Sequence, residues 1–115
     1  SAPLSDTVAS VRALMKHPAF DMKNPNRVRA LVGAFSANHL RFHDKSGAGY
    51  RLLGDVIRTL DPMNPQVAAR LAGAFETWRR YDTDRQAAMR AELETILAQK
   101  GISPNLFEVS SKILG

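Results

Sequence analysis

The chain has 115 residues, no cysteine, and 16 Lys and Arg against 11 Asp and Glu, for a net charge of +5. This length suits one domain with a real hydrophobic core, and the lack of cysteine excludes disulfide scaffolds and cysteine-based zinc sites. The excess of positive charge is compatible with an anionic partner, but many soluble domains are equally basic. No apolar run reaches the roughly 18 residues that cross a bilayer, and no signal peptide is evident. We therefore expect no membrane contact and a cytoplasmic location.

Apolar residues recur at helical spacing along the whole chain, and no segment alternates with period two, so the sequence predicts an all-α fold. The first predicted helix begins at Ser5 or Asp6 and stops before Pro18, and the second covers 24–37. A third helix ends at DPMNP, residues 61–65, because proline interrupts helices. Its apolar stripe consists of Tyr50, Leu53, Ile57 and Leu60.

Three more helices are predicted in the second half of the chain. The fourth covers 64–79, and its apolar stripe consists of Val67, Leu71, Ala74, Phe75 and Trp78. The fifth ends at Gly101, a residue type that commonly follows a helix C-terminus; its stripe consists of Met89, Leu93, Ile96 and Leu97. Ser103 and Pro104 then begin a last short helix, which runs to Ile113.

The second and fourth helices begin with nearly the same sequence. NPNRVRALVGAF at 24–35 and NPQVAARLAGAF at 64–75 lie at a constant offset of 40 residues, and each begins with Asn as N-cap and Pro at N1. A helical repeat of this length is typical of stacked helix pairs. We therefore predict a single domain, 1–115, built as a right-handed superhelical stack of HEAT- or armadillo-like pairs with about six helices. The paired Gly33 and Gly73 indicate that another backbone comes close there.

Residues that could carry catalysis are scarce. His39 and His43 have the i, i+4 spacing of zinc ligands on a helix, but a zinc site needs a third ligand, so we interpret both as surface or capping residues. DKSGAGY at 44–50 has the small residues of a phosphate-binding loop without its spacing or a preceding strand. A connector between helices explains that segment better. We predict neither catalytic nor metal-binding residues in this chain.

Basic residues are the remaining candidates for a site. Arg27, Arg29 and Arg70 flank the apolar stripes of the two repeated helices, where they either face a groove or solvate the rim and pair with carboxylates such as Glu76. WRRYDTDR at 78–85 mixes aromatic and basic residues, as nucleic-acid surfaces do. It fits better as a helix end whose cations complement the helix dipole.

Several blocks of this sequence resemble the C-terminal domain of bacterial aminopeptidase N, a zinc-dependent gluzincin family. They are HPAFDMKNPNRVRALVGAFSAN, FHDKSGAGY, NPQVAARLAGAF and RRYDTDRQAAMRAELETI, and the resemblance covers about Ser5 to Leu114. It implies a superhelix of HEAT- or armadillo-like repeats within an enzyme that removes N-terminal residues from peptides with zinc-activated water. The family's HExxH and GxMEN motifs lie in another domain and do not occur here. The resemblance therefore implies that this chain alone is inactive and holds no cofactor, with zinc in the parent catalytic domain.

The same resemblance implies that the chain walls and closes a peptide chamber, with the catalytic domain of its own polypeptide and peptide substrates as partners. It also implies that Arg29 and Arg70 point into that chamber. A stand-alone helical-repeat scaffold for a protein partner remains an alternative, and a basic nucleic-acid-binding module is a weaker one. If repeats precede the chain in a longer array, its first helix presents an uncovered apolar face. We then expect self-association of the isolated domain through Leu4, Val8, Val11 and Met15.

Overall fold

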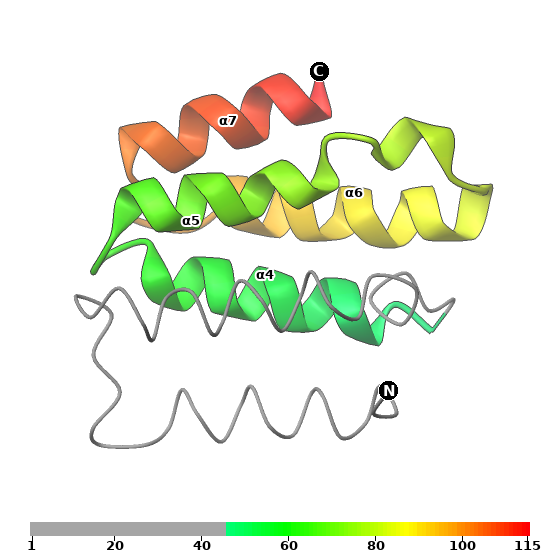
Figure 1. Cartoon of the computed structure of the whole chain (residues 1–115), viewed down its shortest axis with the longest axis horizontal. Coiled ribbons are helices and arrows are strands. Elements are labelled where there is room, and N and C mark those ends of the chain that lie inside the picture. The colour runs from blue at the N-terminus through cyan, green and yellow to red at the C-terminus, as the bar shows by residue number, and fades with distance from the viewer. Residues whose placement is uncertain (1–45) are drawn as a thin grey trace.

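The computed structural model describes residues 46–115, which form four α-helices and two 3-10 helices (Figure 1). The helices are α4 (Ala48–Leu60), α5 (Pro65–Ala72), η1 (Gly73–Phe75), η2 (Trp78–Arg80), α6 (Thr83–Leu97) and α7 (Pro104–Leu114). No strand occurs between residues 46 and 115, and the predicted all-α class is confirmed. Three predictions concern residues outside the described range: the helices before α4, the first repeat copy with Gly33, and the apolar face around Leu4, Val8, Val11 and Met15.

Local capping signals fix where the described helices begin. Asn64 is the N-cap of α5, and its side-chain oxygen accepts a hydrogen bond from the Val67 amide at 3.2 Å. Ser103 does the same for α7, accepting from the Leu106 amide at 3.1 Å. Proline follows each cap at the first helical position, where the missing N–H costs nothing. Both predicted starts are therefore confirmed.

The fourth helix is shorter than the sequence pattern predicts. Of the range 64–79, only Pro65–Ala72 is α-helical, and η1 follows directly. A 3-10 turn has 3.0 residues per turn instead of 3.6, so the buried face changes phase there. Ala74, predicted to be buried, is exposed, whereas Phe75 is fully buried and its ring packs 6.3 Å from that of Tyr50 in α4.

The core lies between the four α-helices. Most of the large side chains of this core come from α4, and α6 adds one residue per turn at Met89, Leu93 and Ile96. α5 and α7 run side by side and pack on each other as well as on this core (Figure 1). The core residues are Tyr50, Leu52, Leu53, Val56, Ile57, Leu60, Val67, Ala68, Leu71, Ala72, Phe75, Trp78, Met89, Leu93, Ile96 and Leu106.

A buried carboxylate joins the end of α4 to the start of α7. Asp61, the residue after α4, is only 1% exposed and accepts hydrogen bonds from the Ser103 amide, at 2.8 Å, and from the Ser103 hydroxyl. The same hydroxyl oxygen caps α7, so one serine serves both helices. A buried carboxylate is costly unless it is hydrogen-bonded, and the positive N-terminal end of α7 also stabilises it. We call this pair the Asp61–Ser103 clamp.

The other end of α7 is held by η2. The Trp78 indole N–H donates to the Ile113 carbonyl at 2.9 Å, and the Arg79 guanidinium donates to the Leu114 carbonyl at 2.7 Å. The last carbonyls of a helix have no partner within it, and a cation there also complements the helix dipole. α7 is thus hydrogen-bonded to other segments at both ends.

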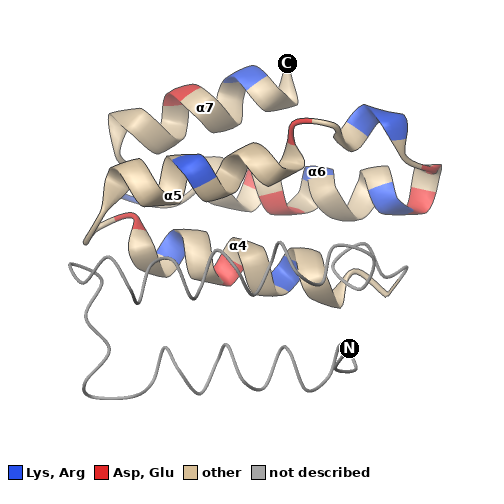
Figure 2. Ribbon diagram, in the orientation of Figure 1, with Lys and Arg blue, Asp and Glu red and all other residues tan. Residues whose placement is uncertain are grey.

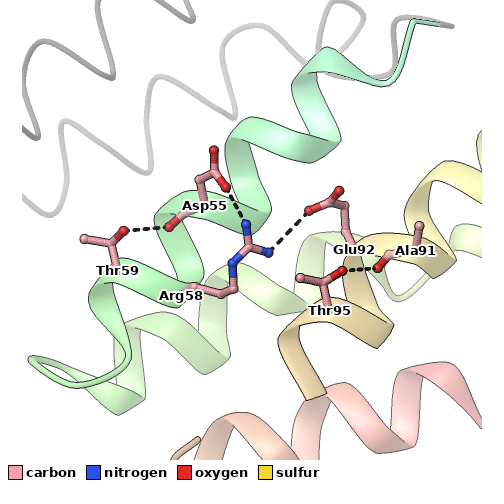
Figure 3. A network of polar contacts seen from close by, with 6 residues as sticks. All are labelled: Asp55, Arg58, Thr59, Ala91, Glu92 and Thr95. Carbon is pink, nitrogen blue, oxygen red and sulfur yellow. Dashed lines mark hydrogen bonds and ion pairs between the residues drawn. The ribbon is translucent and has the colours of Figure 1, made fainter. Parts of the chain in front are cut away.

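α4 and α6 meet at a glycine. A methyl group at Gly54 would collide with the Glu92 carboxylate in its present position, so a side chain at residue 54 would require the end of the Glu92 side chain to move. Glu92 Oε1 lies 3.5 Å from Arg58 Nη1, an ion pair without hydrogen-bond geometry, and Arg58 also pairs with Asp55 on its own helix (Figure 3). The Glu92 side chain is only 13% exposed. Burial raises its pKa above the ordinary value of 4.5, and the nearby Arg58 opposes this in part.

Substitution of glycine by alanine tests whether another backbone lies close to Gly73, as the sequence predicted. Gly73 has φ −57°, and no heavy atom of the described residues lies within 4 Å of the place that an alanine methyl group would take. Gly73→Ala should therefore stabilise the chain by about 0.4–1 kcal/mol. Gly101→Ala should destabilise it by about 1–2 kcal/mol, because Gly101 has φ +79°. Urea unfolding measures both changes. Destabilisation by Gly73→Ala would show instead that another backbone approaches this glycine.

A second prediction concerns pH. Because the folded-state pKa of Glu92 is raised, its contribution to stability is fully present below the unfolded value and is lost as the pH rises through the folded value. Glu92→Gln should match the wild type at a pH below the ordinary value of 4.5 and be more stable than the wild type at neutral pH. Glu94→Gln, at an exposed pair with Arg90 on the same helix, is the matched control. If Glu92→Gln is the less stable protein at neutral pH, attraction to Arg58 dominates over burial.

Candidate functional site

The exposed side of α5 carries the one candidate arginine that the structure describes. α5 buries Val67, Ala68, Leu71 and Ala72 against the core and leaves Arg70 exposed on its opposite side. The helix begins at its asparagine cap and has only eight residues. The cap fixes where the helix begins, and the buried apolar residues fix which face of it packs on the core. Together they determine that Arg70 lies on the exposed side.

Arg70 differs from most cations of the described part in having no partner there. Four cations form ion pairs, namely Arg58, Arg85, Arg90 and Lys112. Arg51 and Arg79 donate to backbone carbonyls. Within residues 46–115, no ion pair or side-chain hydrogen bond is found for Arg70, Arg80 or Lys100. Pairing of Arg70 with Glu76 is likewise not observed, and no acceptor within residues 46–115 holds the guanidinium of Arg70.

The helix beside α5 supplies no competing carboxylate. α7 carries a single acidic residue, Glu108, which pairs at 3.0 Å with Lys112 one turn later. Basic and acidic residues are interspersed over the described helices, apart from the two adjacent arginines of η2, Arg79 and Arg80 (Figure 2). Residues 46–115 hold nine basic and eight acidic side chains, so only +1 of the total charge of +5 belongs to this part.

The other predicted site residues are not placed by the structure. Arg27 and Arg29, and the histidine pair His39 and His43, lie outside the described residues. The convergence of Arg29 and Arg70 on one groove therefore stays a prediction.

The aromatic and basic segment 78–85 has a structural role. Trp78 is 7% exposed, its N–H is used by Ile113, and the Arg79 guanidinium lies 5.1 Å from its ring centroid. A ring covered in this way offers no face to a nucleic-acid base. Asp82 then caps α6, and a hydrogen bond from the Arg85 side chain lowers the pKa of its carboxyl group. The segment is therefore a junction between helices and not, as predicted, the last turn of the helix that begins at Pro65.

The described part of DKSGAGY is the start of a helix. Gly47, with φ 79°, occupies the N-cap position of α4, and Gly49 and Tyr50 already lie within that helix. The Arg51 side chain donates back to the Ser46 carbonyl at 3.2 Å and closes the turn. Burial raises the pKa of Tyr50 to about 12, so its phenol is a neutral core group at physiological pH.

Within residues 46–115, no group of three or more His, Cys, Asp or Glu side chains is arranged to hold a metal ion. None of the helices in that range has the length and hydropathy of a membrane span.

Comparisons with known proteins give a consistent result. The chain matches, over residues 1–115, the family described as "Domain of unknown function (DUF3458_C) ARM repeats". It is 48% identical over 114 residues to aminopeptidase N of Caulobacter vibrioides, covering 98% of this chain. It is 42% identical over 113 residues to that of Haemophilus influenzae and 40% identical over 115 residues to that of Escherichia coli, covering 97% and 99% of this chain.

A solved structure shares the fold. The crystal structure of Legionella pneumophila aminopeptidase A in complex with aspartic acid superposes with a TM-score of 0.81 at 40% identity, over 95% of this chain. The chain spans only 13% of the length of that protein and 13% of each aminopeptidase N. It belongs to the DUF3458_C family of ARM-repeat domains and corresponds to the C-terminal domain of bacterial aminopeptidase N.

Proposed function

We propose that the chain is the non-catalytic C-terminal domain of a zinc-dependent aminopeptidase N, where it walls and closes the peptide chamber over the catalytic domain. The observation that carries this proposal is the 40–48% identity to three aminopeptidases N over nearly the whole chain, which spans 13% of their length. Its partners are the catalytic domain of the same polypeptide and the peptide substrate, and its location is cytoplasmic.

The proposed architecture extends the described helices to the full chain. Residues 1–115 form one domain of about six helices in a right-handed superhelical stack, with repeat helices near 24–37 and 64–79. The match to ARM repeats supports this arrangement. Because each repeat covers its neighbour in such a stack, one side of the domain remains free to face the rest of the enzyme.

Arg70, with Arg29 and Arg27 of the first repeat copy, is proposed to face the chamber. Arg70 supports this role because it is exposed and has no partner within the described residues. A guanidinium presents a planar fork of donors that suits a carboxylate or a peptide carbonyl. Arg29 and Arg70 occupy repeat positions that differ by one residue, which corresponds to about 100° around a helix. Each therefore projects from a different flank of its helix, toward a shared groove.

A stand-alone helical-repeat scaffold is the second candidate, favoured by the same match to ARM repeats. The two proposals differ in whether a catalytic domain with HExxH precedes this sequence in the same polypeptide. A nucleic-acid-binding module has less support, because Trp78 is buried and the described part has almost no excess of positive charge. Its binding to DNA or RNA would fall steeply with salt.

The chain expressed alone should neither retain zinc nor hydrolyse an aminoacyl anilide, because no residues proposed to bind zinc belong to it. Metal analysis after gel filtration and an anilide assay provide the test, with the full-length enzyme as positive control. Stoichiometric zinc in the isolated chain, together with activity that a chelator removes, would show that the chain is itself a peptidase.

In the full-length enzyme, Arg70→Ala should raise the KM for an oligopeptide roughly tenfold, because a hydrogen bond to a charged group is worth about 1.5–3 kcal/mol. The kcat should change little if the arginine holds substrate and transition state equally. A single-residue anilide, too short to reach Arg70, should be unaffected.

Arg80→Ala is the matched control for this experiment, because Arg80 is also exposed and has no partner among the described residues but lies in η2. It should leave both substrates unchanged. Equal losses for the oligopeptide and the anilide, or no loss for either with Arg70→Ala, would contradict a groove role for Arg70.

A further inference from the structure

The Asp61–Ser103 clamp lies where α5 and α7 both begin. Asp61 comes three residues before Asn64, the N-cap of α5, and Ser103 is itself the N-cap of α7. The two helices then run side by side from this end (Figure 1). The clamp therefore joins the starting points of two packed helices that are distant in sequence.

The short connection between α4 and α5 transmits this constraint. The Leu60 carbonyl accepts from the amides of Met63, at 2.9 Å, and Asn64, at 2.7 Å, which makes residues 61–64 a tight turn. Asn64 then fixes the first turn of α5 through the Val67 amide. A continuous run of hydrogen-bonded backbone thus connects Asp61 to α5.

Hydrogen bonds from the start of α7 hold the Asp61 carboxylate next to Ser103. Within the described residues it forms no ion pair, and both of its oxygens accept from Ser103. A negative charge is unfavourable at the C-terminal end of α4 and favourable at the N-terminal end of α7. The charge therefore holds the turn before α5 against α7.

We propose that Asp61 and Ser103 are positioning residues for Arg70, so that the clamp sets the place of Arg70 relative to α7 and to the substrate groove. This inference rests on the proposed substrate-facing role of Arg70. α5 has only two turns, and Arg70 lies six residues after its cap. If the cap residue Asn64 shifts, the whole short helix moves with it, and the guanidinium of Arg70 is displaced by a similar distance.

The test uses the full-length enzyme with an oligopeptide and a single-residue anilide. Asp61→Asn removes the charge and turns one acceptor into a donor, and Ser103→Ala removes the hydroxyl that serves both helices. Each should raise the KM for the oligopeptide roughly threefold to tenfold, since displacement of a binding group by about 1 Å weakens its contact. The kcat and the anilide kinetics should stay unchanged, and Ser103→Thr, which keeps a hydroxyl, should restore the wild-type KM.

A double variant separates positioning from general weakening. If Asp61 acts through Arg70, Asp61→Asn combined with Arg70→Ala should have the same KM as Arg70→Ala alone, because nothing remains to be positioned. Asp84→Asn, an exposed carboxylate in the first turn of α6, is the control for loss of one negative charge and should change neither KM.

The outcomes distinguish this inference from the function on which it rests. If Arg70→Ala raises the peptide KM but Asp61→Asn and Ser103→Ala do not, the clamp has no positioning role and the proposed function stands. Additive effects in the double variant, or equal losses for peptide and anilide, also overturn the positioning role. If Arg70→Ala has no effect, both the groove role and this inference are wrong. Should Asp61→Asn fail to fold, Ser103→Ala decides the question.

Discussion

The described structure depends on the hydrogen bonds between Asp61 and Ser103. A carboxylate that is only 1% exposed and has no cation beside it within residues 46–115 would destabilise most folds. Here it is balanced by an amide, a hydroxyl and the positive end of a helix. Because residue 61 follows α4 and residue 103 begins α7, the charge is satisfied only when these two helix ends have come together.

This constraint matters because the helices it connects are short. α5 has eight residues and α7 has eleven, and helices shorter than about 12–15 residues are marginal on their own in water. Their stability must come from packing and from bonds at their ends. The clamp supplies these bonds at one end of α7, and Trp78 and Arg79 supply them at the other. Arg70 therefore projects from a two-turn helix whose place depends on contacts with the rest of the domain.

Local signals in the sequence predicted most of the described helices. The Asn–Pro and Ser–Pro caps and the apolar stripe of α4 act within one or two turns, so they can be read without knowing the fold. The glycine at 101 was a poorer signal, because α6 ends at Leu97, four residues before it. The change from α5 to a 3-10 turn at Gly73 was not predicted, because the i, i+4 spacing of Leu71 and Phe75 is that of an α-helix. The exposure of Ala74 follows from that change.

Interactions between distant residues could not be predicted in this way. Asp61 and Ser103 are 42 residues apart, and the DPMNP sequence indicates only where a helix must end. The one available signal was an aspartate at the C-terminal end of a helix, where a negative charge is unfavourable. Gly54 gave no signal at all, yet the Glu92 carboxylate lies against it, whereas a methyl group at the conspicuous Gly73 would meet no heavy atom of the described residues within 4 Å. The flank position of Arg70 left open whether this residue faces a groove or pairs with a carboxylate at the rim, so its exposure and its lack of a carboxylate partner within residues 46–115 required the structure.

The chain corresponds to the C-terminal domain of bacterial aminopeptidase N, and the central claim is that the exposed side of α5 faces the proposed peptide chamber. The most direct measurement is a crystal structure of the full-length enzyme with an uncleaved oligopeptide bound. Our account predicts that α5 borders the enclosed chamber, with the Arg70 guanidinium within hydrogen-bonding distance of a peptide carboxylate or carbonyl. An α5 that lies on the outer surface of the enzyme, with Arg70 in bulk solvent and remote from the peptide, would contradict it.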